Sequence, residues 1–498
     1  MKWLSTGLAD LDLILGGGLQ PGSVVVVAGP PGSGKTILAQ QICFTNATAE
    51  NKAVYYTTLS EPHSKLVEHL RGFAFFDPTA LGPKVEYVHL GDMLRDTGDN
   101  DLEPLINEVV RRALDDEPVL VVIDSSKMLR DFVGEHALRM ALYDLSSRVA
   151  HSRAVLLLLG EYTPEDMQTG AEFTLADGIV QLSHQSREPV DRRGLRVVKM
   201  RAADHLGGTH TVQITTQGLQ VYPRVESLLP HDVPAKVERI PSGVPGLDAL
   251  MGGGIPHGDA TLVLGPSGVG KTISCLNFVA EGLARGERCL YIAFQDTVDQ
   301  LVDMAGTFGW DFAAARAGDQ LVISHVPVGD LDLDVLASVI RHRLTDSAIT
   351  RVVIDNLAEM VHAAREAERF PAYLRSLLGV VRAAGASLWV TSETRTFGPM
   401  EEPLVGLMFL FHNVVPVRYI EHRSEIGRAV NVLKMRNSRH DNGMYTCRIA
   451  DEGLSVGDRL HDLTGMLGWS SLRDWPTPSG HDGTATSQAA AVDAPTNH

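Results

Sequence analysis

The chain has 498 residues, and its 61 acidic against 44 basic side chains give a formal net charge of −17. The length predicts two to four domains, and a hydrophobic content of 44% excludes a disordered chain. The acidic balance argues against sequence-independent capture of DNA, which needs dense lysine and arginine. The four cysteines form no Cys-x-x-Cys pair, which excludes a cysteine-only zinc ribbon and a disulfide scaffold and fits a reducing cytosol.

Neither a targeting segment nor a membrane span is expected. Asp10 and Asp12 interrupt the apolar region that an N-terminal signal peptide would need. The longest apolar runs, at residues 24–27 and 156–159, have the length of buried strands, whereas a membrane helix needs about 20 apolar residues. We therefore expect a cytoplasmic protein.

Strand-like and helical runs alternate along the chain. The first half predicts a strand, a helix, a strand, a helix and two further strands at residues 23–28, 36–47, 53–58, 66–73, 119–123 and 155–159. The second half predicts strands at residues 260–264, 289–294, 351–354 and 387–391. Such alternation indicates an α/β fold with a mostly parallel sheet and helices on both of its faces.

The chain repeats itself. Thr-Gly-Leu at residues 6–8 and three glycines at 16–18 recur as Ser-Gly-Val at 242–244 and three glycines at 252–254, each 236 positions later. A Lys-Met-Arg triplet at 199–201 recurs at 434–436, 235 positions later. Matches over this range exclude a solenoid of small repeats and indicate one duplicated domain.

The repeat sets the expected domain boundaries. We predict a first domain at residues 1–228, a linker at 229–238 and a second domain at 239–468. The linker is polar and holds two prolines. The remaining residues, 469–498, are rich in Gly, Ser, Thr, Pro and Ala and predict a disordered tail, which is either a frayed terminus or a partner-binding segment.

A phosphate-binding loop occurs once in each half. Both loops match the pattern GxxxxGK[ST] between a strand and a helix: Gly29-Pro30-Pro31-Gly32-Ser33-Gly34-Lys35-Thr36 and Gly265-Pro266-Ser267-Gly268-Val269-Gly270-Lys271-Thr272. Glycines let the backbone N–H groups point at phosphate oxygens, and the following helix N-terminus favours anions. The lysine is expected to reach the terminal phosphates and the threonine to ligate Mg²⁺.

An aspartate ends a buried strand in each half, at Asp124 and Asp355. Ligands of parallel α/β sheets bind at the carboxyl ends of the strands, and a P-loop needs a carboxylate near its metal. We predict Thr36, Asp124, Thr272 and Asp355 as the Mg²⁺-binding residues. The alternative is that each aspartate only caps the helix that follows.

Hydrolysis also needs a group that orients or deprotonates the attacking water. The segments that begin at Tyr56 and Tyr291 align with an offset of 235, which pairs Glu61 with Asp296 just after a strand. We predict these two as the general bases. The alternative is a surface acid that starts the next helix.

The Lys-Met-Arg triplets end strand-like runs at residues 195–198 and 430–433. Strand alternation places Lys199 and Arg201, or Lys434 and Arg436, on one face with the methionine on the other. The triplets are either solvated edge strands or cationic fingers that reach the nucleotide of a neighbouring subunit and neutralise charge on the transferred phosphoryl group.

These motifs together resemble the KaiC family, the double-domain branch of the RecA-like ATPases. The resemblance covers roughly residues 4–460 and includes the glycine motifs, both P-loops, the strand-end aspartates and residues 428–441. It implies a homohexamer of two stacked rings, ATP and Mg²⁺ at subunit interfaces, slow ATP hydrolysis and signalling to protein partners. In the circadian clock member it also implies a Ser/Thr autokinase and autophosphatase in the second domain.

Two departures from the family pattern stand out. The clock protein carries paired glutamates after the second strand of each domain, and here Ser60 and Gln295 stand in the first position of each pair. Its adjacent Ser-Thr phosphosites fall at Met408 and Phe409, which carry no hydroxyl. Thr394 and Thr396 are the nearby hydroxyl-bearing candidates.

Three functions are therefore open. The chain is expected to be a signalling ATPase, with or without autokinase activity. A RecA-like DNA-dependent ATPase is disfavoured by the net charge and by the lack of a separate basic domain. A scaffold that ATP assembles, with little turnover, fits the missing carboxylates.

Overall fold

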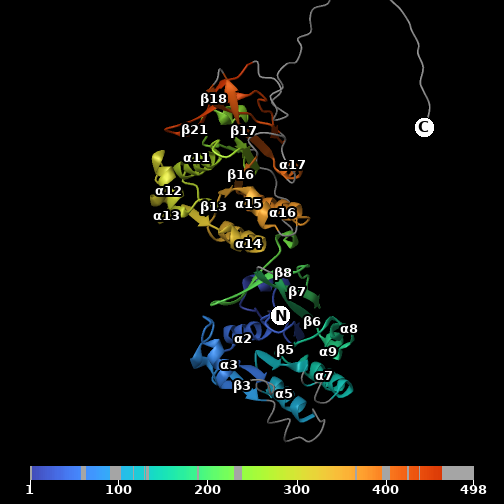
Figure 1. Cartoon of the computed structure of the whole chain (residues 1–498). Helices are drawn as coiled ribbons and strands as arrows, with labels where there is room; N and C mark the ends of the chain where they lie inside the picture. The colour runs from blue at the N-terminus through green and yellow to red at the C-terminus, as the bar shows by residue number, and fades with distance from the viewer. Residues whose placement is uncertain are drawn as a thin grey trace, which may run out of the picture.

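The chain forms two lobes that stack end to end, the first drawn in blue to green and the second in yellow to red (Figure 1). The computed structural model describes residues 3–57, 63–89, 103–115, 117–127, 129, 134–187, 190–228, 238–364, 367–394, 404–422, 425–436 and 438–461. Among these residues, no helix has the length and apolar character needed to cross a membrane.

The first lobe is built on a nine-stranded sheet with the order β3-β2-β4-β5-β1-β6-β7-β8-β9. The first six strands of this order, β3-β2-β4-β5-β1-β6, run parallel to one another. Strands β7, β8 and β9 continue the sheet with antiparallel pairing. Its strands are β1 (Val24–Ala28), β2 (Ala53–Thr57), β3 (Val85–His89), β4 (Leu120–Asp124), β5 (Val155–Gly160), β6 (Gly178–Arg187), β7 (Val190–Met200), β8 (His210–Thr215) and β9 (Gly218–Tyr222). Its helices include α1 (Ala9–Leu15), α2 (Lys35–Asn46), α3 (His63–Leu70), α5 (Glu103–Asp115), α7 (Glu135–Val149), α8 (Pro164–Thr169) and α9 (Ala171–Leu175).

The second lobe repeats this topology in the order β14-β13-β15-β16-β12-β17-β18-β20-β21, with β19 paired to β17. Its strands are β10 (Arg239–Ile240), β11 (Ile255–Pro256), β12 (Ala260–Gly265), β13 (Cys289–Ala293), β14 (Leu321–His325), β15 (Arg351–Asp355), β16 (Ser387–Glu393), β17 (Asn413–His422), β18 (Glu425–Val430), β19 (Lys434–Met435), β20 (Tyr445–Ala450) and β21 (Gly453–Arg459). Its helices are α10 (Leu247–Leu250), α11 (Lys271–Ala284), α12 (Val298–Thr307), α13 (Phe312–Ala317), α14 (Leu333–Asp346), α15 (Leu357–Ala363), α16 (Phe370–Ala383) and α17 (Leu404–Leu407).

The predicted fold class is confirmed: each half is a mostly parallel sheet covered by helices. The strands predicted from the alternating pattern occur within one or two residues of their expected bounds, and the predicted run at 195–198 lies inside the longer strand β7 (Val190–Met200). One element differs, because β18 ends at Val430 and a separate strand begins at Lys434, so the predicted strand over residues 430–433 is wrong. Here residues 431–433 leave the hairpin, and β19 pairs with the start of β17 instead.

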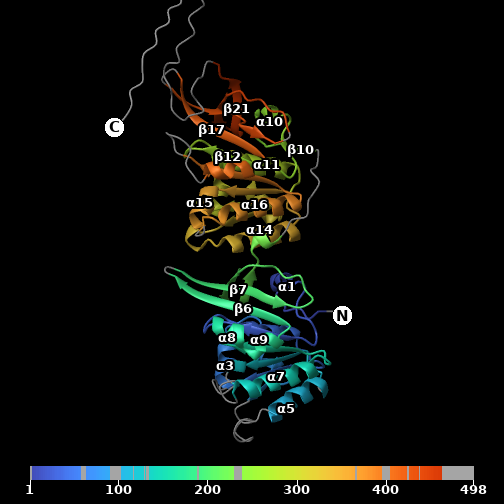
Figure 2. The same ribbon diagram turned by 90° about the vertical axis from the view of Figure 1, so that its right-hand side faces the viewer.

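Each sheet has an apolar core on both of its faces. Every residue of β1 is buried, which explains why the valine run shows no polar alternation. One face of the first sheet packs on α7 and α9, and the other packs on α1 and α2. The second sheet is covered in the same way by α14, α15 and α16 on one face and by α11, α12 and α13 on the other. Figure 2 shows these helical layers on both lobes.

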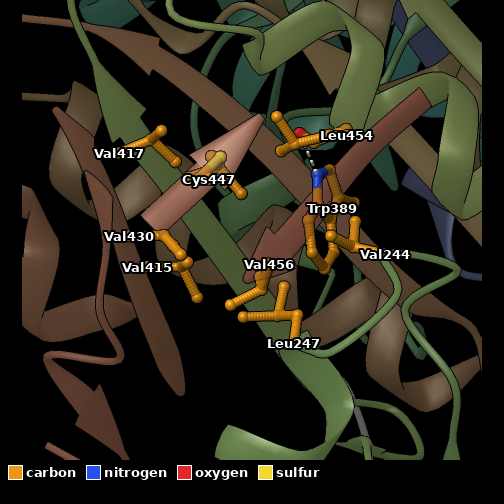
Figure 3. Close-up of a pocket in the computed structure, with 11 residues that line it drawn as sticks. Val244, Leu247, Trp389, Val415, Val417, Val430, Cys447, Leu454 and Val456 are labelled. Atoms are coloured by element: carbon orange, nitrogen blue, oxygen red, sulfur yellow. Dashed lines mark hydrogen bonds between the residues drawn. The ribbon is translucent and has the colours of Figure 1, made fainter. Parts of the chain in front are cut away.

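A small hollow lies in the core of the second lobe, between α10, α11 and the strands that follow β12. Figure 3 shows Trp389, Leu454 and Val456 among its lining side chains, with the Trp389 indole N–H donating to the Ser274 hydroxyl at 3.2 Å. The cavity holds only about 10 Å³, which is the lower limit for one water molecule, and its lining is almost entirely apolar. It is therefore a packing gap and no ligand site.

Charged side chains join the two lobes. Arg369, at the start of α16, donates to Glu226 of the first lobe at 2.9 Å and also contacts Asp334 of α14. Burial acts to raise the pKa of Glu226, but the hydrogen bonds from Arg369 bring it down to about 2. A second contact joins Asp10 of α1 to Arg341 and to the Ser338 hydroxyl of α14. Both contacts are largely shielded from solvent, so they are stronger than exposed ion pairs.

A buried arginine organises the core of the second lobe. The Arg351 side chain is 0% exposed and forms a two-point ion pair with Glu287, with N–O distances of 2.8 and 3.1 Å. It also donates to the backbone carbonyls of Pro241 and Phe278 and lies over the Phe278 ring. Each nitrogen of the guanidinium therefore has a hydrogen-bond partner, as a buried charge requires.

We expect Arg351→Met to lower the free energy of unfolding by about 3–5 kcal/mol, because it removes the charged partner of Glu287, which keeps only the Thr350 hydroxyl, and the donor of two carbonyls. Urea denaturation followed by circular dichroism measures the change. Arg285→Met is the matched control, because Arg285 forms an exposed helix pair with Glu281 and its loss costs no more than about 0.5 kcal/mol. Equal effects of the two substitutions would contradict this account.

Candidate functional site

The first P-loop joins β1 to α2 at the carboxyl edge of the sheet. Gly32 and Gly34 have φ angles of 71° and 100°, which side chains other than glycine rarely adopt. Gly29 approaches β6 so closely that a Cβ atom there would lie 2.6 Å from the Leu182 carbonyl oxygen. These glycines let the loop fold tightly around the N-terminus of α2.

The second P-loop has the same geometry between β12 and α11. Gly268 and Gly270 have φ angles of 75° and 108°, and a Cβ atom on Gly265 would lie 2.4 Å from the Val417 carbonyl oxygen. A cavity of about 240 Å³ opens beside this loop. Besides loop residues such as Thr272, it is lined by residues that include Gln295, Asp296, Asp355 and Glu393.

Both P-loop lysines fold back across their loops. Lys35 donates to the Gly29 and Pro30 carbonyls at 2.9 Å, and Lys271 donates to the Pro266 carbonyl at 2.9 Å. Burial lowers the pKa of both ammonium groups, and nearby carboxylates oppose that shift. One of those carboxylates is Glu161, whose Oε1 lies 3.8 Å from the Lys35 Nζ.

The strand-end aspartate of the first half is tied to the P-loop. Asp124 Oδ2 accepts hydrogen bonds from the Thr36 hydroxyl at 2.9 Å and from the Tyr55 hydroxyl at 2.8 Å. Burial raises the pKa of Asp124, and these two hydrogen bonds act in the opposite direction. The two predicted metal-binding residues of this half are therefore in direct contact.

The second half uses the same arrangement with one change. Asp355 accepts a hydrogen bond from the Tyr291 hydroxyl at 2.9 Å and a second one from the Thr391 hydroxyl. Thr272 lines the same cavity as Asp355. The peptide bond that follows the aspartate is cis in both halves, at 124–125 and at 355–356.

Of the two predicted general bases, the structure describes Asp296 and not Glu61. Asp296 lines the cavity beside the second P-loop, and burial, together with Asp355, raises its pKa. Glu61 lies outside the described residues. The strand alignment behind the pair needs a correction, because Tyr55 and not Tyr56 is the counterpart of Tyr291: both hydroxyls bind the strand-end aspartate. The offset of the strand is thus 236, which would pair Asp296 with Ser60 if it continued past the strand. The pairing of Glu61 with Asp296 requires one additional residue after the strand in the first half, and it stays a prediction.

Sequence analysis missed two kinds of residue at these sites. Tyr55 and Tyr291 hold the aspartates, and an offset of 236 would have matched them. Arg193 donates to the Gly32 carbonyl at 3.0 Å, and Arg428, 235 positions later, lies 3.4 Å from the Gly268 carbonyl. Both arginines come from the antiparallel strand beyond β6 or β17, so each P-loop is covered by a distant hairpin.

Each Lys-Met-Arg triplet lies near the amino ends of the parallel strands, whereas the P-loops lie at their carboxyl ends. The Arg201 N–H donates to the Asp177 carbonyl and the Arg436 N–H to the His412 carbonyl, just before β6 and β17 begin. The P-loops follow the carboxyl ends of β1 and β12, which run parallel to β6 and β17. A strand of five or six residues, roughly 17–20 Å, therefore separates each triplet from the P-loop of its own half.

The residues of both loops fit a magnesium-bound nucleoside triphosphate. The buried hydroxyl of Ser33 has no hydrogen-bond partner within the described part of the chain, and it lies in the first loop, where phosphate oxygens would be acceptors. One carboxylate and one hydroxyl per site also suit Mg²⁺, which keeps waters and phosphate oxygens as its other ligands. No cluster of three or more His, Cys, Asp or Glu side chains occurs in the described ranges, so an all-protein metal cage is absent there.

Two P-loops, each at the carboxyl edge of a mostly parallel sheet and each beside a strand-end aspartate, define a protein of two tandem RecA-like domains. A family model described as "ATPase: KaiC" matches residues 4–226 and 240–461. The chain therefore belongs to the KaiC family of ATPases.

Curated relatives match nearly the whole chain at low identity. The "Circadian clock protein KaiC3" of Synechocystis sp. is 26% identical over 478 residues, which cover 93% of either chain. The "Circadian clock oscillator protein KaiC" of Picosynechococcus sp. is 25% identical over 481 residues, 94% of this chain and 92% of the relative. The protein of the same name from Synechococcus elongatus is 24% identical over 485 residues, 94% and 92% of the two chains.

We expect Tyr55→Phe with Tyr291→Phe to raise the Mg²⁺ concentration needed for half-maximal ATP hydrolysis by about tenfold, because each loss frees an aspartate beside the P-loop. Magnesium titration of the steady-state hydrolysis rate measures the shift. Tyr373→Phe is the control, since its buried hydroxyl donates to the Leu333 carbonyl away from both loops. An unchanged magnesium requirement in the double variant would show that the tyrosines do not position the metal-binding carboxylates.

Proposed function

We propose that the chain hydrolyses MgATP at both P-loops, that each site is completed by a neighbouring subunit of a homohexamer, and that the nucleotide state is read by protein partners. Membership of the KaiC family supports ATP binding and hydrolysis as a class of activity. The geometry that carries the proposal is the separation of each cationic triplet from its own P-loop by a whole strand length.

An ATP site shared between two subunits requires this separation of each triplet from the P-loop of its own lobe. Lys199 and Arg201 stand at the amino edge of the first sheet, and Lys434 and Arg436 stand at the corresponding edge of the second. A side chain cannot bridge the length of β1 or β12 to the loop of its own lobe. In a ring of like-oriented subunits, the triplet of one subunit and the P-loop of the next can meet, and the lysine and arginine then neutralise charge on the phosphoryl group.

Each residue has a defined role in this proposal. Lys35 and Lys271 leave their carbonyl partners and bind the terminal phosphates, while the loop N–H groups and the helix N-termini hold the phosphate oxygens. Thr36 with Asp124, and Thr272 with Asp355, would hold Mg²⁺, which neutralises charge on the phosphates when bound. Asp296, and Glu61 in the first half, accept the proton of the attacking water.

The double variant Lys35→Ala with Lys271→Ala is expected to lose ATP hydrolysis to below about 1% of the wild-type rate, because both phosphate-binding ammonium groups are removed. Phosphate release under saturating MgATP measures the rate. Lys84→Ala serves as the control, since Lys84 is exposed and distant from both loops. Undiminished turnover of the double variant would contradict the proposed sites.

The second site allows a test of the general base. In a Lys35→Ala background, turnover is expected to fall on acidification as Asp296 becomes protonated. Because burial and Asp355 raise the pKa of Asp296, the midpoint should lie above the ordinary aspartate value of about 3.9. Asp296→Asn should remove that acidic limb and lower kcat by about 10²–10⁴-fold. A variant that keeps both the rate and the limb would exclude Asp296 as the base.

The family's autokinase activity is not part of this proposal. Met408 and Phe409 stand where the clock protein carries its phosphosites, and neither can accept a phosphoryl group. The Thr394 hydroxyl oxygen is buried, and Thr396 lies outside the described residues. Incubation with γ-labelled ATP and phosphopeptide mapping separates the two activities, because label retained on the protein would favour an autokinase.

Two other functions make different predictions. An ATP-assembled scaffold would form hexamers with ATP but release almost no phosphate, so hexamer formation and hydrolysis measured side by side distinguish it. A DNA-dependent ATPase would be stimulated by single-stranded DNA in a salt-sensitive way. The Thr36–Asp124 hydrogen bond at the first P-loop, and the shared cavity of Thr272 and Asp355 at the second, favour the signalling ATPase over the scaffold.

A further inference from the structure

The residue that precedes β6 in the first lobe differs from its counterpart before β17 in the second. Asp177 and His412 occupy matching places: the next residues, Gly178 and Asn413, pair with Val25 of β1 and Thr261 of β12. Both contact the backbone N–H that begins the central strand. The duplicated fold thus holds a carboxylate at this place in one lobe and an imidazole in the other.

In the first lobe the carboxylate also holds the arginine of the cationic triplet. Asp177 Oδ2 accepts the Val24 N–H at 3.0 Å, and Asp177 Oδ1 accepts the Arg201 guanidinium at 3.0 Å. The Arg201 side chain is 58% exposed and that of Asp177 is 29% exposed, so the pair stands at the surface. No other ion pair of Arg201 is found among the described residues.

In the second lobe the imidazole replaces the carboxylate, and the nearby acid Asp259 lies 3.8 Å from His412 Nδ1 with no ion pair to Arg436 among the described residues. Burial raises the pKa of Asp259 to about 6, and Arg382 and Arg436 act in the opposite direction. His412 Nδ1 faces the Ala260 N–H at 3.1 Å, and its other nitrogen faces Arg382. Burial and Arg382 lower the pKa of His412 to about 4, so the ring is uncharged at neutral pH. Arg436 instead donates to the Phe409 carbonyl at 2.6 Å, and no ion pair of Arg436 is found in the part of the chain that the structure describes.

Asp177 binds one N–H of the Arg201 guanidinium and offsets part of its charge, so it competes with a phosphate of the next subunit for this group. Arg201 must leave Asp177, at least in part, before it can contact a phosphoryl group, whereas Arg436 exchanges only a neutral carbonyl. We propose that Asp177 is a positioning residue that restrains the Arg201 finger, and that His412 removes this restraint from Arg436, so that the two ATP sites of one chain differ in their access to the finger.

This inference rests on the proposed role of the triplets in a neighbouring subunit's site. The size of the effect follows from the exposure of the Asp177–Arg201 pair, since exposed ion pairs change an equilibrium by no more than about fivefold. Asp177, which competes for Arg201, should therefore lower the hydrolysis rate at the first type of ATP site about two- to fivefold. The KM for ATP should change less, because the competing pair is broken mainly in the transition state.

The first lobe is tested in full-length protein that carries Lys271→Ala, so that only the first type of site turns over. Asp177→Asn keeps an acceptor for the Val24 N–H and removes the charge, and it should raise kcat about two- to fivefold. The gain should vanish when Arg201→Ala is added, because the finger on which Asp177 acts is gone. A gain that persists without Arg201, or no gain at all, would overturn the proposal.

The second lobe gives an independent test in a Lys35→Ala background. His412→Asp and His412→Asn differ only in charge, and the aspartate variant should turn over about two- to fivefold more slowly than the asparagine variant. Equal rates would overturn the proposal even if Asp177→Asn failed to fold. Arg201→Ala alone separates the two ideas: if it leaves first-site turnover unchanged, the finger role itself is wrong, whereas a slow Arg201→Ala variant with no charge effect rejects only the Asp177 restraint.

Discussion

The contact between Asp124 and the P-loop residue Thr36 is the interaction on which the organisation of the first lobe depends, and in the second lobe Tyr291 and Thr391 hold Asp355 instead. Asp124 can stay half-buried at the edge of the sheet because Thr36 and Tyr55 donate to it, and these three residues come from α2, β2 and β4. A buried carboxylate without donors would be strongly destabilising. The same hydrogen bonds thus fix the spacing of three elements and hold the oxygen atoms that suit Mg²⁺ beside the loop.

The fold and most of the candidate site were predictable from the sequence because the repeat supplied each motif twice. A P-loop is a local feature, and a strand-end aspartate follows a readable apolar run, so Lys35 and Asp124 needed no knowledge of distant contacts. Tyr55 escaped because two adjacent tyrosines lie in one buried strand, and only the hydrogen bond identifies the one that faces the aspartate. Arg193 escaped because its partner, Gly32, is 161 residues away and the antiparallel hairpin that joins them has no local signature.

The two lobes differ in the polar contacts of their solvent-exposed charged side chains. They are alike in the features that the packed backbone restricts. Glycine conformations, sheet order and the tyrosine–aspartate contact recur in both halves. The partners of the cationic triplets do not recur: Lys434 donates to three carbonyls around residues 408–411, and no hydrogen bond of the Lys199 side chain is found within the described ranges. Close packing restricts the first group of features, whereas polar surface contacts can change at little cost in stability.

The ion pairs that join the lobes have a consequence for symmetry. Because Arg369 and Arg341 tie α16 and α14 to the first lobe, each chain presents its two nucleotide-binding edges at a set angle to one another. A closed assembly of such chains contains equal numbers of first and second lobes, arranged about one common rotation axis. If neighbouring first lobes twist relative to one another, the second lobes of the same chains must then twist to match. Otherwise the salt bridges between the two lobes must absorb the difference.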